Sequence, residues 1–358
     1  MKIKERPYTY LEFCQMIQPP FKVLCFLTLD DSWAPPESII NLEYIFKKHR
    51  FSMESMGEMR KLTCIWVDPI TENRIPVVYY AYLNPKTKLL SCFTDAPSDQ
   101  IEKTIGAIAD EPGVYNLWIG PTAMEEIKDE IISKYPYSDI TTFTAKRTSS
   151  YIFKGKIRPD FDRTIVYYGK DGLKTLEEAK YYYGAFPTDI LFDVPAVMRF
   201  RVNAKGAFSL EFGNKEYFFD IFNNTLEIVQ NIRKTVESSR FELTTVQMER
   251  KELKVPFLVP WEIEFSKELE YPDAEVLVNK LQENGFTLYN YILSKGSVLL
   301  DSNIIDEVKK CMFSISMGSS RMVVVPRHYI HFDSFLRFFQ TIVEDLDPQA
   351  KCHVGREG

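Results

Sequence analysis

The sequence predicts an α+β protein of two domains, built from mostly antiparallel sheets that are each covered by helices. Its 358 residues exceed the roughly 100–200 residues of one typical domain. The chain holds 26 Phe and 20 Tyr against only 15 Gly, a composition that favours well-packed strands over loops. Some segments alternate apolar and polar residues and others have helical spacing, so both element types are expected.

Two neighbouring segments, 197–202 and 207–212, show the alternation most clearly. Met198, Phe200 and Val202 are apolar, and Arg199 and Arg201 stand between them. One face of this hairpin is therefore expected in the core and the other in water, as in an antiparallel sheet. Further strands are expected at 61–67, 75–83, 88–94, 215–222, 241–248, 286–293, 297–300 and 321–325.

Helices are expected where a capping residue precedes apolar residues spaced three or four apart. Ser98 and Asp333 are good N-caps, and Pro121 suits a first helical position. Gly285 suits a left-handed C-cap. The predicted helices lie within 98–113, 121–135, 223–239, 272–285 and 333–346.

The least structured segment, around 145–163, divides the chain in this prediction. Residues 1–145 form a mixed α/β domain, residues 146–163 a basic linker or ribbon, and residues 164–358 an antiparallel α+β domain. Prolines make 255–273 a second candidate junction. Helix, polar break and strand recur in that order, which suggests a duplicated strand–strand–helix unit, although two-layer packing alone also produces such a pattern.

Composition and charge exclude several classes of protein. Six cysteines lie far apart without a CxxC pair, and the amino terminus shows no signal peptide, so a cytoplasmic protein is expected. No apolar run approaches the ~20 residues of a membrane span, so no membrane partner is expected. A net charge of −6 and a pI of about 5.5 argue against a protein that coats nucleic acids.

Signatures of common catalytic sites are missing from the sequence. It has no GxxxxGK[ST] phosphate loop, no GxGxxG, no GxSxG nucleophile elbow and no HExxH zinc motif. His328 and His331 precede the cap Asp333, and an extended chain points them to opposite faces, so they fit a strand end better than a metal site. We therefore expect no catalytic residues, no metal and no cofactor.

A basic strip at 146–163 is the most informative charge feature. It holds six basic and two acidic residues, a net charge of +4, with Tyr151 and Phe153 interleaved. Cations contact phosphates and aromatic rings stack on bases, so this composition suits a nucleic-acid backbone. The candidate nucleic-acid-binding residues are Lys146, Arg147, Tyr151, Lys154, Lys156 and Arg158, joined by Arg199 and Arg201 on the polar face of the hairpin.

The predicted function is a non-catalytic intracellular binding or assembly subunit that has a protein partner and contacts a nucleic-acid backbone through this strip. Two alternatives stay open. In the first, the strip meets an acidic protein, and the chain is a protein–protein scaffold without nucleic-acid contact. In the second, Asp160 and Asp162 form a DxD pattern that holds a divalent ion beside a phosphate, as in a metal-dependent phosphodiesterase.

Overall fold

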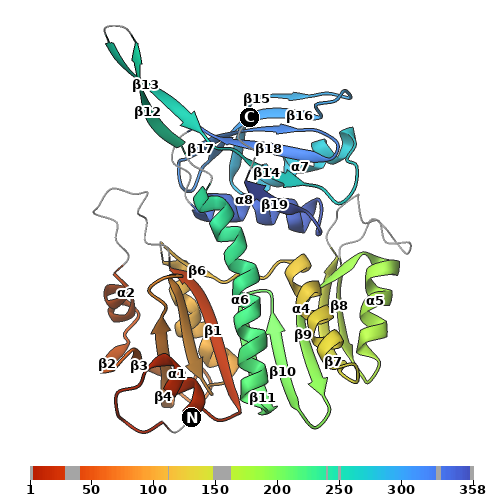
Figure 1. The fold of residues 1–358 in the computed structure, drawn as a ribbon. Helices are drawn as coiled ribbons and strands as arrows, with labels where there is room; N and C mark the ends of the chain where they lie inside the picture. Colours follow the sequence, from red (N-terminus) through yellow and green to blue (C-terminus); the bar gives the residue numbers. More distant parts are fainter. Residues whose placement is uncertain are drawn as a thin grey trace.

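The computed structural model describes residues 3–28, 41–111, 113–147, 163–238, 241–248, 251–327 and 332–354. These residues form two antiparallel sheets of 11 and 6 strands together with helices, so the α+β class predicted from the sequence is confirmed (Figure 1). Within the described ranges, no helix is long and apolar enough to cross a membrane.

The larger sheet follows the order β2-β3-β4-β5-β1-β11-β10-β9-β7-β8, and β6 pairs with β1 beside this path. Its strands are β1 (Phe21–Thr28), β2 (Ser52–Met56), β3 (Met59–Val67), β4 (Arg74–Leu83), β5 (Leu89–Thr94), β6 (Val114–Asn116), β7 (Asp139–Arg147), β8 (Arg163–Tyr168), β9 (Ala185–Val194), β10 (Met198–Asn203) and β11 (Ala207–Gly213). The predicted meander is therefore present as β3, β4 and β5, and the predicted hairpin as β10 and β11.

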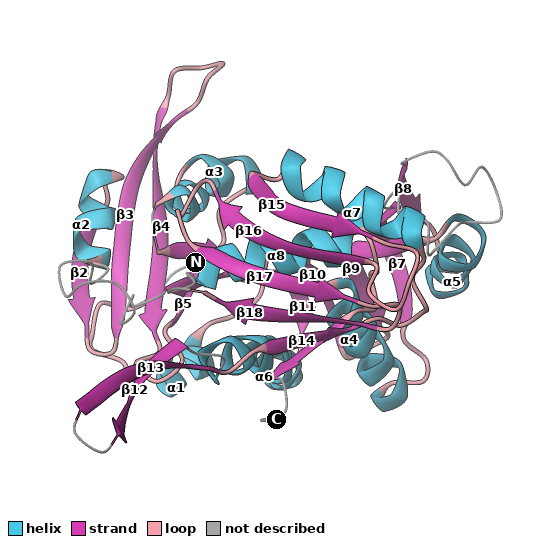
Figure 2. Cartoon of the chain, turned by 90° about the horizontal axis from the view of Figure 1, so that it is seen from above, coloured by secondary structure: helices cyan, strands magenta, loops and turns pink. Residues whose placement is uncertain are grey.

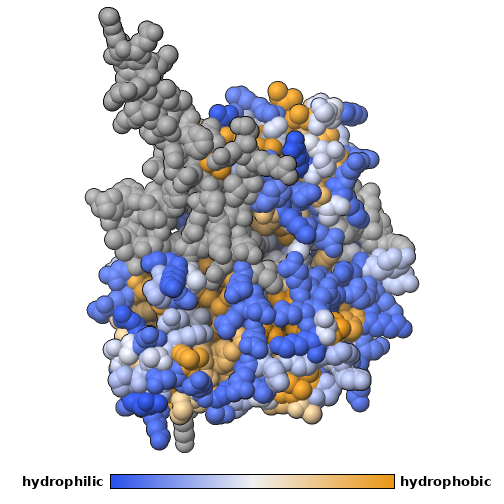
Figure 3. All heavy atoms as spheres, viewed as in Figure 1, coloured by the Kyte–Doolittle hydropathy of each residue, from blue (hydrophilic) through white to orange (hydrophobic). Residues whose placement is uncertain are grey.

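Four helices pack on one face of this sheet, and α4 and α6 lie in front of it in Figure 1. They are α1 (Tyr10–Met16), α4 (Pro121–Lys134), α5 (Gly172–Tyr183) and α6 (Lys215–Ser238). Hydrophilic side chains dominate the outer surface over α4 and the lower part of α6 (Figure 3).

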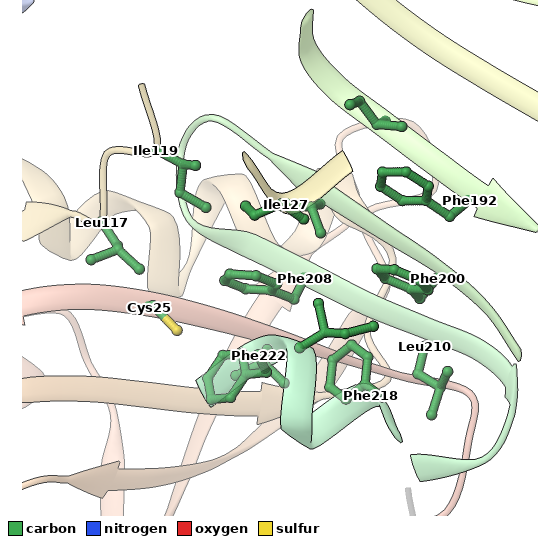
Figure 4. Close-up of a cluster of buried hydrophobic side chains, with 14 of the residues drawn as sticks. Cys25, Leu117, Ile119, Ile127, Phe192, Phe200, Phe208, Leu210, Phe218 and Phe222 are labelled. Carbon is green, nitrogen blue, oxygen red and sulfur yellow. The ribbon is translucent and has the colours of Figure 1, made fainter. Parts of the chain in front are cut away.

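An aromatic cluster fills the space between α6 and the central strands (Figure 4). Phe218 and Phe222 of α6 meet Phe200 of β10 and Phe208 of β11, and the rings of Phe208 and Phe222 lie edge to face at 4.9 Å. Phe21 of β1 packs edge to face against Phe218 at 5.3 Å. β1 and β11 are neighbours in the sheet, although β1 is its first strand along the chain and β11 its last. The cluster therefore joins the beginning and the end of the chain segment that forms the large sheet.

The start of α6 corrects the prediction of a strand at 215–222, which was wrong. The Asn214 side chain accepts the backbone N–H of Glu216 at 2.8 Å and so caps a helix. Phe218, Ile221 and Phe222 then recur at helical spacing and are all buried. The helix predicted within 223–239 is the second part of this longer one.

The opposite face of the β1–β5 half is covered by a second set of helices. These are α2 (Leu42–Lys48), α3 (Ser98–Lys103) and the 3-10 helix η2 (Ile105–Asp110), whose apolar side chains form a separate cluster with that half of the sheet. The helix predicted within 98–113 thus stops at Lys103, because the backbone of Thr104 leaves the helical region and η2 follows.

The smaller sheet follows the order β15-β16-β17-β18-β14-β19 and is reached from α6 through the hairpin β12 (Phe241–Met248) and β13 (Lys251–Leu258). Its strands are β14 (Trp261–Glu264), β15 (Phe286–Leu293), β16 (Leu300–Asp306), β17 (Met312–Met317), β18 (Arg321–Pro326) and β19 (Lys351–Val354). Helices α7 (Tyr271–Glu283) and α8 (Phe332–Asp345) cover one face of it, close to their predicted positions. The short strand predicted at 297–300 instead begins at Leu300.

The expected cut at 145–163 does not separate the two sheets, because β1 pairs with β11 and β7 pairs with β9 across it. The sheets themselves divide after α6. Helix α8 lies between them, as Figure 1 shows, and Figure 2 views the small sheet from above. Trp118, which precedes α4, packs edge to face on Phe339 of α8 with ring centroids 6.0 Å apart.

Asp306, at the end of β16, is fully buried and ties the small sheet to α8. Its carboxylate accepts the backbone N–H groups of Val308 at 2.8 Å and Lys309 at 3.1 Å, the hydroxyl of Ser334 and the guanidinium of Arg337. Burial alone raises the pKa of Asp306, but the bonds from Ser334 and Arg337 outweigh it, so the pKa lies below its usual range.

Asp306→Asn is expected to lower the free energy of unfolding by about 3 kcal/mol at neutral pH, because the partly exposed guanidinium of Arg337 loses its ion pair with the buried carboxylate. A carboxyl whose pKa is lower in the folded state stabilises the fold fully at pH values above its unfolded-state pKa of ~3.9. This stabilisation is lost as the pH falls through the folded-state pKa. Urea unfolding measured across pH checks this, since the difference between wild type and variant shrinks in acid. Asp301→Asn, on the exposed side of the same strand, is the control; equal losses in both variants contradict the account.

Candidate docking surface

The half of the large sheet formed by β7 to β11 presents a polar face on the side away from α4, α5 and α6. Met198, Phe200 and Val202 of β10 point into the helix-covered core, so Arg199 and Arg201 point the other way, as the sequence predicts. Both arginines are half-buried on this helix-free face.

Each of the two arginines has a carboxylate partner on a neighbouring strand. The Arg199 guanidinium lies 3.2 Å from the Glu211 carboxylate, and Arg201 donates to Asp189 at 3.1 Å. Burial raises the pKa of Asp189 above its usual range, and the charge of Arg201 opposes that rise. These charges therefore stabilise one another across β9, β10 and β11, and the two arginines are not free cations for the successive phosphates of a nucleic-acid backbone.

The described residues at the two ends of the basic strip, Lys146, Arg147 and Arg163, differ in exposure and in their neighbours. Lys146 is exposed near the top of β7, close enough to Glu344 of α8 for its charge to lower the pKa of that carboxyl. Burial and the charge of Asp345 act the other way and keep the pKa of Glu344 raised. Arg147 is only 4 % exposed, so its guanidinium does not lie on the open surface. Arg163 stacks over the ring of Tyr183 at 5.1 Å.

The remaining predicted residues lie outside the described ranges. They are Tyr151, Lys154, Lys156 and Arg158 of the strip, the DxD pair Asp160 and Asp162, and the histidines His328 and His331. Over the ranges that the structure does describe, no group of three or more His, Cys, Asp or Glu side chains is placed to hold a metal ion.

Among the described strands, β8 is one edge of the large sheet and differs from β2, β15 and β19, the other outer strands of the two larger sheets. Free strand edges are templates for pairing, and proteins usually protect them with charges, bulges or short length. The other edges carry such features: β2 has the exposed Glu54, β19 has four residues with the exposed Lys351, and β15 has a bulge at Asn290. By contrast, the charge of β8 stands at its first residue, Arg163, which stacks on Tyr183, and residues 164–168 read TIVYY.

Apolar side chains surround this edge. Val166 is 53 % exposed and Tyr168 is 77 % exposed, both on the side of β8 away from the Ile165 and Tyr167 side chains that pack on the core. On α5, which contacts β8, the rings of Tyr181 and Tyr182 are also exposed and lie edge to face at 5.0 Å. Exposed apolar side chains beside a strand edge are typical of sites of protein–protein contact.

Two comparisons with known proteins match this chain. A model for a family middle domain, AF_0896_M, matches residues 122–205, which run from α4 to the end of β10. A protein of Archaeoglobus fulgidus, described only as uncharacterized, is 28 % identical over 324 residues, which cover 86 % of this chain and 80 % of that protein. The matched segment 122–205 contains both the β8 edge and the arginines of β10.

Sequence reasoning missed the β8 edge, and one signal could have found it. A short run of β-branched and aromatic residues predicts a strand. If such a strand carries no charge and lies at the edge of a sheet, the edge is unprotected. Its position at the edge, however, follows from β7 pairing with β9 on its other side, which no local pattern in the sequence reveals.

The pairing on the helix-free face predicts a pKa change. In Arg201→Gln, Asp189 keeps its burial but loses the opposing positive charge, so its pKa is expected to rise further. The carboxyl carbon of Asp189, followed by NMR as a function of pH, measures this. Arg199→Gln, which removes the partner of Glu211, is the control and should leave the titration of Asp189 almost unchanged. A titration of Asp189 unaffected by Arg201→Gln contradicts the assignment.

Proposed function

We propose that this chain is a non-catalytic assembly subunit of the cytoplasm, which docks a protein partner along the β8 edge, and that its first partner is a second copy of itself. The observation that carries the proposal is the uncharged run 164–168 at the edge of the sheet, with exposed Val166 and Tyr168. Addition of a strand to such an edge supplies main-chain hydrogen bonds, and apolar side chains beside it supply burial.

Self-pairing of β8 satisfies the constraints on an antiparallel edge. Residues directly opposite each other in an antiparallel pair lie on the same face of the sheet. About a two-fold axis at Val166, that residue meets its own copy, Thr164 lies opposite Tyr168, and Ile165 lies opposite Tyr167. No like charges meet in this arrangement, and two-fold dimers are the commonest homo-oligomers.

Val166→Lys is expected to weaken self-association roughly tenfold or more, because a lysine at the axis brings two like charges together. Val67→Lys is the matched control, since Val67 is 52 % exposed on β3, an interior strand. Sedimentation velocity over a range of protein concentrations gives the mass of each species. A wild-type protein that stays monomeric, or a dimer that both variants weaken equally, contradicts docking of a second copy at β8.

Nucleic-acid contact through the strip 146–163 is the second candidate function. Its support is the net charge of +4 in this segment and the exposure of Lys146 at its start. The paired state of Arg199 and Arg201 makes these two residues weaker phosphate contacts than their sequence positions suggest.

Fluorescence anisotropy with labelled single- and double-stranded DNA and RNA tests this second candidate. Binding by the strip is expected to fall steeply as salt rises, because phosphate contacts release counter-ions. Changing Lys154, Lys156 and Arg158 together to Glu should abolish it, whereas Arg199→Gln should reduce it little. Absence of binding to every oligomer at low salt excludes this candidate and leaves the assembly function.

A further inference from the structure

A row of three polar residues crosses the helix-free face where β1, β11 and β10 lie side by side. In the strand register, Ser209 of β11 is the direct partner of both Lys22 of β1 and Arg201 of β10. Direct partners in an antiparallel sheet lie on the same face, with Cα atoms about 5 Å apart. Two cations therefore stand on either side of one serine hydroxyl, on strands that are distant in sequence.

This row forms one wall of a cavity of about 380 Å³. Ser98, at the start of α3, faces it from the other side, and Asp95 and Glu211 complete the polar lining. The cavity is independent of the β8 edge, which lies at the far end of the sheet order.

The polar groups around the cavity are held in place by neighbours that leave donors available. The Lys22 amine donates to two neutral acceptors, the backbone oxygen of Ala96 at 2.9 Å and the hydroxyl of Ser98 at 3.1 Å, and an ammonium has a third donor. Arg201 donates to Asp189 through one nitrogen, which fixes the guanidinium, whose other N–H groups remain to bind a ligand.

Lys22 and Arg201 lie close enough for their charges to repel each other. Partial burial lowers the pKa of Lys22 and the nearby charge of Arg201 lowers it further, against the effect of Asp99. Glu211, the acid next to the row, is held by Arg199. An anion seated over Ser209 would relieve the repulsion between Lys22 and Arg201.

We propose that the cavity lined by Lys22, Ser98, Arg201 and Ser209 binds the phosphate group of a small phosphorylated metabolite. Lysine and arginine supply charge-assisted hydrogen bonds to the phosphate oxygens, and the two serine hydroxyls supply neutral ones.

Isothermal titration calorimetry of the full chain with glycerol 3-phosphate and with inorganic phosphate tests this proposal at constant ionic strength. Wild-type protein is expected to bind, and Lys22→Gln is expected to raise the Kd roughly tenfold or more through loss of one charge-assisted bond. Lys205→Gln, the same change of charge in the exposed β10–β11 turn, is the control and should keep the wild-type Kd. Tighter binding of the ester than of phosphate identifies an ester ligand, and equal binding identifies phosphate itself.

Three results overturn the proposal. One is no heat of binding for either probe at concentrations up to about 10 mM. The second is an equal loss of affinity in Lys22→Gln and Lys205→Gln, which shows only general attraction of anions. The third is binding of a short oligonucleotide without binding of either probe. Circular dichroism checks that Lys22→Gln is folded; if it is not, Ser209→Ala replaces it, with the same expected direction.

Discussion

The packing of α6 against the central strands is the interaction on which the rest of the structure depends. Phe218 and Phe222 fill the space over β10 and β11, and Phe21 brings β1 to the same cluster. Truncation of a buried phenylalanine costs about 3–5 kcal/mol, so a few such rings account for much of the stability of a domain. The same helix continues upward to the hairpin β12–β13 and the small sheet, so the cluster also fixes where the second sheet begins.

This packing determines which surfaces are left for function. Helices α1, α4, α5 and α6 bury one face of the large sheet, and α2, α3 and η2 bury the other face over β1–β5. The helix-free face of β7 to β11 carries partly buried polar side chains, which form ion pairs such as Arg201–Asp189. The β8 edge bounds this half of the sheet on one side, and the cavity at Lys22 lies on the other side, where β10 and β11 meet β1.

Local patterns in the sequence predicted many helices and strands, but they did not predict which strands pair with each other in the sheets. Pro121 in the first turn of α4 and the alternation around Phe200 identify a helix and a hairpin, because these signals act within one turn or one strand. Ser98, predicted as an N-cap, is instead the first residue of α3, and Pro97 precedes it without a side-chain cap. The segment 215–222 failed, because its aromatic residues suit a strand equally well and only the capping role of Asn214 distinguishes a helix. The row Lys22–Ser209–Arg201 could not be predicted, because strand pairing between distant segments creates it. The repeat of strand–strand–helix units stays a prediction.

The central claim is that the β8 edge is kept unprotected for a partner strand. Amide hydrogen exchange of β8, measured at low and at high protein concentration, tests this most directly, because a paired edge protects backbone N–H groups that an open edge exposes to water. The account predicts that exchange in 164–168 slows as the concentration rises, while exchange in β2, the opposite edge of the same sheet, does not change. Exchange in β8 that is the same at every concentration would contradict it.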